Sequence, residues 1–372
     1  MKKCLIIFGT RPEAIKMAPL VSEFKNNNSF DIKVCVTAQH REMLDQVLSF
    51  FQINPDYDLN LMSPNQSLYT LTSDIILGLK SVLNDFRPDY VFVHGDTTTS
   101  MAAGLAAFYF GAKICHVEAG LRTNNKQSPF PEEINRQITG RIADYHFAPT
   151  EQSKINLIKE NIDESTIIVT SSTVIDALIE SSNRVHSIEN DEINHLKSII
   201  NKDSKLILVT GHRRENHGRG FIEICTALQE IAIAYPDVQI VYPVHLNPNV
   251  KQPVYDILSG IQNVILIDPL SYPAFVWIMT QSYIIITDSG GVQEEAPSLG
   301  KPVLVMRDTT ERPEAVEAGT VILVGTDKEK IFQEATSLLN DISRYKSMSA
   351  LHNPYGDGKA CARIVDLISS LN

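Results

Sequence analysis

Short runs of apolar, mostly β-branched residues alternate along this chain with longer amphipathic segments of helical length. In the first half, the short runs predict strands at residues 4–8, 32–37, 90–94, 113–117, 145–148 and 166–170. Between two of them, in segment 67–86, apolar residues recur at helical spacing. Strands that alternate with helices in this way are typical of βαβ units in a parallel sheet.

A second series of strands follows the polar stretch 181–203. These strands are predicted at residues 205–210, 239–243, 264–267, 283–287, 302–306 and 320–324, and a last helix is predicted at 359–371. Two doubly wound α/β domains account for this length without a long structureless loop. Ligands of such folds bind outside the carboxyl ends of the strands, so we expect the functional cleft between two facing sheets.

The composition argues against two classes of partner. The 372 residues include 33 Lys and Arg against 44 Asp and Glu, a formal net charge of −11, whereas nucleic acids and anionic membranes select basic surfaces. Five widely spaced cysteines favour reduced thiols. The apolar runs 4–8 and 101–112 are too short for a signal peptide and a membrane span. We therefore expect a soluble, cytoplasmic protein with no nucleic-acid or membrane partner.

Basic residues follow the first predicted strand. Segment 9–12 leads into a predicted helix that carries Arg11 at its N-terminus and Lys16 about one turn further on. These two side chains suit a diphosphate or a sugar, but a capped helix with two solvated bases explains the spacing equally well. Neither the dinucleotide fingerprint G-x-G-x-x-G nor a Walker A motif occurs in the chain.

Three acidic loops follow neighbouring strands of the first half. Asp96 and Glu118 come directly after two consecutive predicted strands, and Glu132 opens the next predicted helix. Because parallel strands end at one edge of their sheet, these carboxylates suit general acid/base chemistry. Helix capping is the structural alternative for Asp96, and the helix dipole explains Glu132 equally well. Neither alternative explains Glu118.

The second half offers a site for an anion. The basic segment 212–214 follows one strand end, and the turn 289–291 leads from another strand into a helix, with its backbone N–H groups facing outward. Glu295 lies one turn later, where a carboxylate can accept hydrogen bonds from ribose hydroxyls, and Arg312 follows a third strand. We expect a nucleotide diphosphate here, whereas a plain glycine-rich turn explains only the glycines.

Metal ligation is not expected from the sequence. The motif H-E-x-x-H is absent, and His94, His116 and His146 belong to different strand ends. The D-x-D sequence at residues 56–58 resembles that of metal-dependent sugar transferases, but we expect it to lie in a proline-rich turn.

Five segments together resemble one family, the non-hydrolysing bacterial UDP-N-acetylglucosamine 2-epimerases. They are FGTRPEA at 8–14, HGDTTT at 94–99, HVEAGLR at 116–122, GHRRE at 211–215 and DSGG at 288–291. The resemblance implies a GT-B-like fold of two Rossmann-like domains facing across a cleft. The first would comprise residues 1–171 plus 358–372, with the last helix crossing back, and the second, UDP-binding domain residues 172–357.

The same resemblance implies interconversion of UDP-N-acetylglucosamine and UDP-N-acetylmannosamine, which supplies N-acetylmannosamine for cell-surface polysaccharide. One route to this interconversion eliminates UDP, which leaves 2-acetamidoglucal, and then adds UDP back. This route needs carboxylates near C2 and O3 of the sugar and cations at the diphosphate. The other route, oxidation by a bound dinucleotide, lacks its fingerprint, so no cofactor is expected. Alternatives are a hydrolysing epimerase releasing N-acetylmannosamine and UDP, a glycosyltransferase with a separate acceptor, and a non-catalytic nucleotide-sugar sensor.

Position by position, the resemblance also assigns roles. It makes Asp96, Glu118 and Glu132 the acid/base carboxylates and puts His212 at the diphosphate. Substrate-binding residues would be Arg11, Lys16, Arg136, Leu270, Phe275, Ser289, Gly290, Gly291, Glu295 and Arg312. A second UDP-N-acetylglucosamine, acting as an allosteric activator, would meet Gln39, His40, Arg213 and His245. A homodimer is implied as well.

Overall fold

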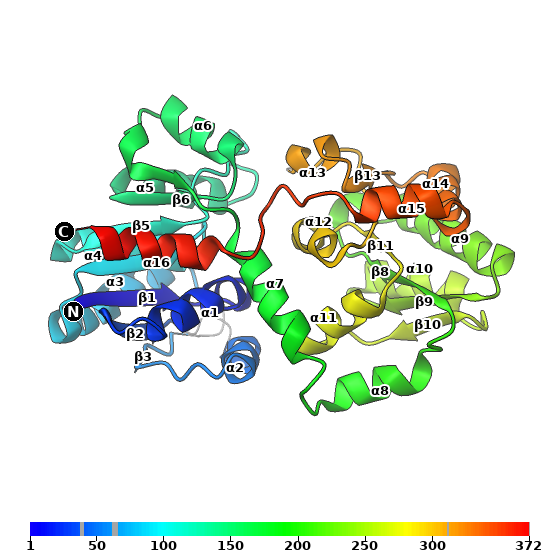
Figure 1. Cartoon of the computed structure of the whole chain (residues 1–372), viewed down its shortest axis with the longest axis horizontal. Helices are drawn as coiled ribbons and strands as arrows, with labels where there is room; N and C mark the ends of the chain where they lie inside the picture. Colours follow the sequence, from blue (N-terminus) through cyan, green and yellow to red (C-terminus); the bar gives the residue numbers. More distant parts are fainter. Residues whose placement is uncertain (38–40, 62–65, 311, 372) are drawn as a thin grey trace. The chain divides into compact units, whose positions relative to one another are not determined.

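The computed structural model describes residues 1–37, 41–61, 66–310 and 312–371. The chain divides into two compact units, Met1–Ala177 with Tyr355–Asn372, and Leu178–Pro354 (Figure 1). The helix α7 (Thr173–Arg184) runs from the first unit into the second. The unit boundaries therefore lie close to, but not at, the expected domain boundaries of 171/172 and 357/358.

The first unit is built on a parallel seven-stranded sheet in the order β3-β2-β1-β4-β5-β6-β7. Its strands are β1 (Lys2–Phe8), β2 (Phe30–Val36), β3 (Tyr57–Asp58), β4 (Tyr90–His94), β5 (Lys113–Val117), β6 (Tyr145–Ala148) and β7 (Ile167–Val169). The six strands predicted in this half are confirmed to within one or two residues at each end. The strand order reverses between β1 and β4, which defines the switch point of a doubly wound sheet.

Two of the three residues of the D-x-D sequence, Tyr57 and Asp58, form strand β3, and only Asp56 lies in the bend before it, so the expected turn does not cover the whole sequence. Tyr57 and Asp58 pair with the end of β2, and Asp56 accepts a hydrogen bond from the backbone N–H of Val34 at 2.9 Å. Asp58 pairs with Arg41. A two-residue edge strand shows no alternation in the sequence, and its flanking polar residues concealed it.

Helices cover both faces of this sheet. They are α1 (Arg11–Lys25), α2 (Arg41–Phe50), α3 (Leu68–Phe86), α4 (Thr98–Phe110), α5 (Glu132–Ile142), α6 (Glu151–Lys159), the 3₁₀ turn η1 (Glu164–Thr166), the start of α7, and α16 (Ala360–Ser370). On one face, Leu5 and Val93 pack with residues of α3 and α4. On the other, Phe24 of α1 meets Phe92 of β4 edge-on at 5.0 Å.

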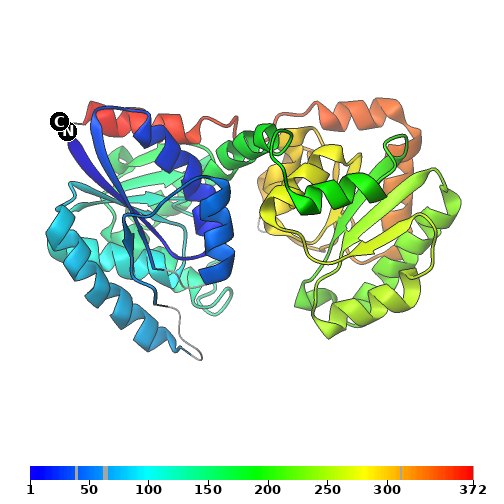
Figure 2. The ribbon, with the colours of Figure 1, turned by 90° about the horizontal axis from the view of Figure 1, so that it is seen from below.

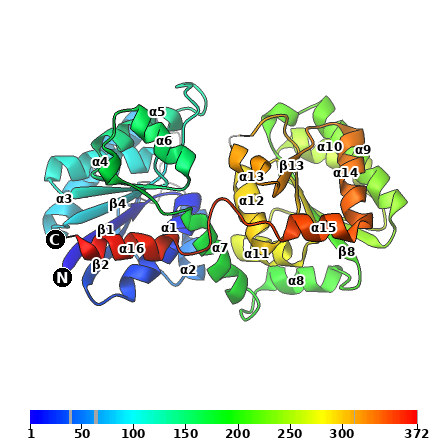
Figure 3. The ribbon, with the colours of Figure 1, turned by 45° about the horizontal axis from the view of Figure 1, so that its top comes forward.

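The C-terminal helix α16 packs beside α1 (Figures 1 and 3). Asp176 accepts backbone hydrogen bonds from Ala360 at 3.1 Å and Cys361 at 2.9 Å, which caps the helix start. At its other end, Lys2 Nζ donates to Ile368 O at 2.6 Å, and both ends of the chain lie together on this unit (Figure 2).

The second unit has a parallel six-stranded sheet in the order β10-β9-β8-β11-β12-β13, with the switch point between β8 and β11. Its strands are β8 (Lys205–Thr210), β9 (Val238–Pro243), β10 (Val264–Ile267), β11 (Ile284–Thr287), β12 (Val303–Val305) and β13 (Val321–Leu323). All six predicted strands of this half are confirmed. Two doubly wound α/β units make the fold GT-B-like.

The helices of the second unit are α8 (Asp191–Ile199), α9 (Arg219–Ala234), α10 (Pro248–Leu258), α11 (Tyr272–Gln281), α12 (Gly290–Glu295), α13 (Pro313–Glu317), α14 (Lys328–Asn340) and α15 (Ile342–Ser349), with 3₁₀ turns η2 (Arg214–Asn216) and η3 (Ala296–Leu299). Helix α14 lies beside α9 (Figure 3). Helix α8 falls in the polar stretch 181–203, where none was predicted, because only Ile193 and Leu196 of this helix are buried. No helix within the described ranges is both long and apolar enough to cross a membrane.

Candidate functional site

The candidate residues of the first unit gather at the carboxyl edge of its sheet, at and beside the switch point. Arg11 and Lys16 lie in the first turns of α1, which follows β1. Asp96 follows β4, and Glu118 follows β5. A Cβ placed on Gly95 would lie only 3.5 Å from Glu118 Oε1, so the Glu118 carboxylate lies directly against the residue before Asp96.

Glu118 has a strained backbone and a cationic partner. Its φ of +62° lies in the left-handed region, which residues other than glycine and asparagine seldom adopt. Its side chain is 12% exposed and accepts a hydrogen bond from Lys16 Nζ. Such strain persists where the surrounding structure imposes it, which is frequent at functional sites. Glu118, for which helix capping offered no explanation in the sequence, is therefore held in position by its surroundings and by Lys16.

Asp96 is held by helix α5. Arg136 donates a hydrogen bond from Nη2 to the Asp96 carboxylate, and Asn135 Nδ2 donates to the Asp96 carbonyl at 3.0 Å. Glu132 is the first residue of the same helix, one turn before Arg136, and is half-buried. The structure therefore joins Asp96 to Arg136 and Glu118 to Lys16, so two of the three carboxylates each have a cation of their own.

The neighbouring Glu133 has a structural role. It is fully buried and accepts backbone hydrogen bonds from Thr123 at 3.1 Å and Asn124 at 2.9 Å, and it lies 3.3 Å from Arg136 Nη1. Burial by itself opposes ionisation, but these hydrogen bonds and Arg136 lower the pKa of Glu133 below its usual value. This charge keeps Arg136 in place beside Asp96.

Two buried residues that were given no role in the sequence analysis, Glu13 and His94, contact the residues at this edge of the sheet. Glu13 accepts hydrogen bonds from the backbone N–H groups of Gly9 at 3.0 Å and Thr10 at 2.8 Å, and burial raises its pKa. With Thr10 it forms a capping box, a signal readable as T-x-x-E in the sequence. His94 is buried, and its Nε2 lies 3.7 Å from Glu118 Oε2; burial, with Lys16 nearby, lowers the pKa of His94 well below its usual value.

Glycine is required at position 9. A Cβ there would lie 2.0 Å from Thr37 Oγ1 and 2.6 Å from Thr99 Oγ1. The loop that leads to Arg11 therefore passes too close to its neighbours for any other residue.

In the second unit, His212 and Asp288 meet at the switch point between β8 and β11. Asp288 is fully buried, and its Oδ2 accepts backbone hydrogen bonds from His212 and Arg213, both at 2.9 Å. The His212 ring is 49% exposed, and its Nδ1 lies 3.5 Å from Asp288 Oδ1. An acid directly after a buried strand was the available sequence signal for Asp288.

Arg312 lies over the glycine-rich turn. A Cβ on Gly290 would be 2.6 Å from Arg312 Nη1, and Arg312 Nε donates to Glu294 Oε1 at 2.6 Å. A Cβ on Gly291 would be 3.7 Å from Glu295 Oε2. The turn from Ser289 to Gly291, Glu295 and Arg312 therefore form one cluster, in which a guanidinium and backbone N–H groups lie together.

Leu270 and Phe275 lie at the start of helix α11. Both side chains are half-buried, and Ser271 between them is the helix N-cap. Glu192 of α8 accepts a hydrogen bond from the Ser271 hydroxyl, which fixes the segment that carries the Leu270 backbone.

Two of the four residues assigned to an activator lie beside His212. The rings of His212 and His245 stack with centroids 5.6 Å apart, and Arg213 Nε donates to the Asp288 carbonyl at 3.0 Å. Gln39 and His40 lie outside the described residues.

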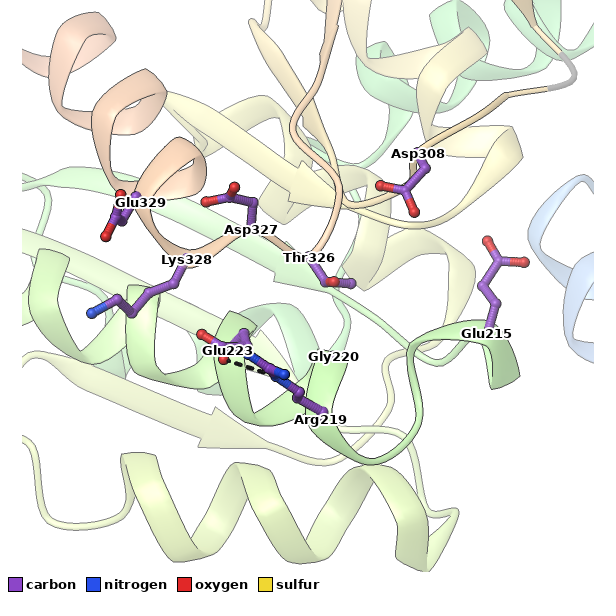
Figure 4. A pocket seen from close by; sticks show the side chains of 9 residues that line it. All are labelled: Glu215, Arg219, Gly220, Glu223, Asp308, Thr326, Asp327, Lys328 and Glu329. Atoms are coloured by element: carbon purple, nitrogen blue, oxygen red, sulfur yellow. Dashed lines mark hydrogen bonds and ion pairs between the residues drawn. The ribbon is translucent and has the colours of Figure 1, made fainter.

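A cavity of about 620 Å³ opens elsewhere in the second unit (Figure 4). Five carboxylates and two cations contribute to its lining, which consists of Glu215, Arg219, Gly220, Glu223, Asp308, Thr326, Asp327, Lys328 and Glu329. This excess of negative charge repels a diphosphate. Within the described ranges, no three His, Cys, Asp or Glu side chains are grouped so that they could hold a metal ion.

Comparison with known proteins gives a consistent result. The family described as UDP-N-acetylglucosamine 2-epimerase matches residues 22–369. The UDP-N-acetylglucosamine 2-epimerase of Escherichia coli K12 is 60% identical over 370 residues, which cover 99% of this chain and 98% of the relative. The Campylobacter jejuni enzyme of the same name is 57% identical, over 99% of this chain and 97% of its own length.

Solved structures agree. The Neisseria meningitidis UDP-GlcNAc 2-epimerase bound to UDP-GlcNAc has a TM-score of 0.89 at 54% identity, covering 99% of this chain and 100% of that one. The Methanocaldococcus jannaschii UDP-GlcNAc 2-epimerase in complex with UDP-GlcNAc and UDP has a TM-score of 0.79 at 34% identity, covering 99% of each chain.

Proposed function

This chain belongs to the UDP-N-acetylglucosamine 2-epimerase family and is a nucleotide-sugar isomerase, and we propose that it inverts C2 of the sugar by eliminating UDP from the substrate and then adding it back. In the forward direction, the C2 proton goes to a base while the C1–O bond breaks and its electron pair leaves with UDP. The intermediate is 2-acetamidoglucal. UDP then adds to C1, and a proton reaches C2 from the opposite face.

Inversion at C2 requires proton transfer on both faces of the ring, so at least two acid/base groups are needed. The first unit supplies Asp96, Glu118 and Glu132 for this purpose. The observation that carries the proposal is the Glu118 geometry, a carboxylate on a strained backbone that is hydrogen-bonded by Lys16. Lys16 and Arg136 orient two of the carboxylates, and Arg11 lines the same part of the sheet edge.

The second unit supplies the groups that bind the nucleotide. The backbone N–H groups of the turn from Ser289 to Gly291, together with Arg312, bind phosphate, and Glu295 binds the ribose hydroxyls. His212 faces the diphosphate and stabilises the charge that develops on it as it leaves. The clustering of Arg312 with Gly290 supports this assignment. Phe275 and the Leu270 backbone flank the uracil.

Regulation and assembly complete the proposal. A second UDP-N-acetylglucosamine acts as activator at Gln39, His40, Arg213 and His245, and the cytoplasmic enzyme is a homodimer that supplies N-acetylmannosamine for cell-surface polysaccharide. Exposed apolar side chains on α3 and α4, including Leu77 at 69% and Tyr109 at 70% exposure, support an interface between two copies.

Product analysis in D₂O tests the proposed function. Purified enzyme with UDP-N-acetylglucosamine alone is expected to form UDP-N-acetylmannosamine, with deuterium at C2 of both sugars in the ¹H spectrum. Free N-acetylmannosamine and UDP in place of UDP-N-acetylmannosamine would identify a hydrolysing epimerase. Turnover only with an added acceptor would indicate a glycosyltransferase, and bound but unchanged substrate a sensor.

A further inference from the structure

The buried carboxylate of Asp288 lies under the loop that carries His212. It follows β11 directly, and its backbone N–H donates to Thr210 O of the neighbouring strand at 3.2 Å. Thr210 and Thr287 also join their hydroxyls at 2.6 Å. A fully buried carboxylate is costly unless polar partners compensate for lost water, so the partners of its two oxygens indicate what it does.

One oxygen fixes the loop backbone. Oδ2 accepts the N–H groups of His212 and Arg213 at 2.9 Å each and lies 3.4 Å from Asn216 Nδ2. Two consecutive backbone donors on one oxygen anchor the loop to the end of β11. This oxygen has its full set of partners.

The other oxygen faces the His212 ring. Oδ1 accepts no hydrogen bond from any residue that the structure describes, and His212 Nδ1 lies 3.5 Å away. The half-exposed ring can turn about its side-chain bonds to close that distance. Among the described residues, His245 also stacks on the ring with centroids 5.6 Å apart, and Arg213 donates from its Nε to the Asp288 carbonyl.

A carboxylate oxygen opposite Nδ1 selects the imidazole tautomer with the proton on Nδ1. We propose that Asp288 is a positioning residue for His212, holding Nδ1–H towards itself so that Nε2 is directed to the diphosphate. When the anionic substrate binds, the ring takes a proton from solvent on Nε2 and donates it as a hydrogen bond to the departing UDP. This role of Asp288 rests on the proposed function, because that function places His212 at the diphosphate.

The tautomer of His212 is directly measurable in the free enzyme. Long-range ¹H–¹⁵N spectra of ¹⁵N-histidine-labelled protein at about pH 8, with His212 assigned by its loss in His212→Gln, are expected to show Nδ1–H in the wild type. In Asp288→Asn, the amide oxygen keeps accepting the two backbone N–H groups, but its NH₂ now faces Nδ1. The ring should then switch to Nε2–H.

An Nε2–H tautomer in the wild-type protein would overturn the proposal, whether or not the variant folds. The same tautomer in both proteins would overturn it too. A merely structural role for Asp288 does not move this signal.

Kinetics provide the second readout. Asp288→Asn is expected to lower kcat by between about 10- and 1000-fold with KM little changed, because the ring, with an amide NH₂ opposite Nδ1, stays a neutral Nε2–H donor and no longer offers a positive charge as UDP departs. In a His212→Gln background, the same substitution should cost less than about 3-fold, since both changes remove one interaction. Equal losses in both backgrounds would contradict the proposal.

Asp308→Asn is the matched control. Asp308 is an exposed carboxylate that follows β12 on the same sheet and lies outside the proposed site, so kcat should stay within about 2-fold. Failure of the proposed function and failure of this inference are distinguishable. The tautomer is measured without substrate and stays meaningful even in a protein that does not epimerise.

Discussion

At the scale of single residues, Asp96 and Glu118 are each held by a cation from a helix that is distant in sequence. Asp96 and Glu118 were identified because each directly follows a predicted strand. Their partners, Arg136 and Lys16, come from helices 40 and 102 positions away in sequence. The left-handed backbone of Glu118 was equally invisible, because nothing in the residue type demands it.

Replacing the carboxylates separately tests their assignment. Asp96→Asn, Glu118→Gln and Glu132→Gln are each expected to lower kcat by about 10²–10⁴-fold, because each variant keeps the shape of the side chain but removes proton transfer. Far-UV circular dichroism should be unchanged. Glu151→Gln, an exposed acid at the start of α6, is the control expected to keep full activity. Wild-type rates in all three variants would reject the assignment.

His116 should make the first unit sensitive to acid. It is fully buried, its Nε2 donates to Gly95 O at 2.7 Å, and burial lowers its pKa from 6.5 to about 3. Below pH 6.5, His116 binds a proton in the unfolded chain but stays neutral in the folded chain. The stabilisation is therefore complete above pH 6.5 and is lost as the pH falls towards 3, at up to about 1.4 kcal/mol per pH unit.

Urea unfolding of the wild type and His116→Gln between pH 7 and pH 5 measures this effect. Glutamine keeps a hydrogen-bond donor for Gly95 O but does not titrate. The wild type should lose about 2 kcal/mol more than the variant across this range, which follows from the same slope. Parallel curves for the two proteins would show that His116 does not titrate differently on unfolding.

At the scale of elements, the spacing of apolar residues was sufficient to predict long helices and buried strands, but it did not reveal short or weakly amphipathic elements. All twelve predicted strands exist, because parallel strands buried on both faces read as continuous apolar runs. Strand β3 and helix α8 were missed, since two residues show no alternation and α8 buries only two side chains. Tertiary partners, β2 and α11, stabilise these two elements.

The capping of α16 by Asp176 can be tested by hydrogen exchange. Asp176→Ala removes the acceptor of the Ala360 and Cys361 N–H groups and should destabilise the helix by about 1–2 kcal/mol. Amide protection in α16 should fall by roughly 5- to 30-fold. Asp163→Ala removes a similar cap from the exposed turn η1 and should leave α16 unaffected. Unchanged protection in Asp176→Ala would mean that apolar packing alone holds the helix.

At the scale of the whole molecule, two sheets with the same core strand order each bring their candidate residues to a switch point. The first unit holds carboxylates with Lys16 and Arg136, and the second holds the Arg312 cluster and the His212–Asp288 pair. In the proposed function, acid/base groups and anion-binding groups are divided between the two units, which accounts for binding of a nucleotide diphosphate by a chain with a net charge of −11. Local placement of a few cations outweighs the overall charge.

The central claim is that the bond between C1 and UDP breaks and re-forms during each inversion. UDP-N-acetylglucosamine carrying ¹⁸O in the C1–O–P bridge tests it most directly, because a free UDP β-phosphate can return through any of its equivalent oxygens. The account predicts that ³¹P and ¹³C spectra show ¹⁸O leaving the bridge for non-bridging positions at a rate comparable to epimerisation. Full epimerisation with the label still entirely in the bridge would contradict it.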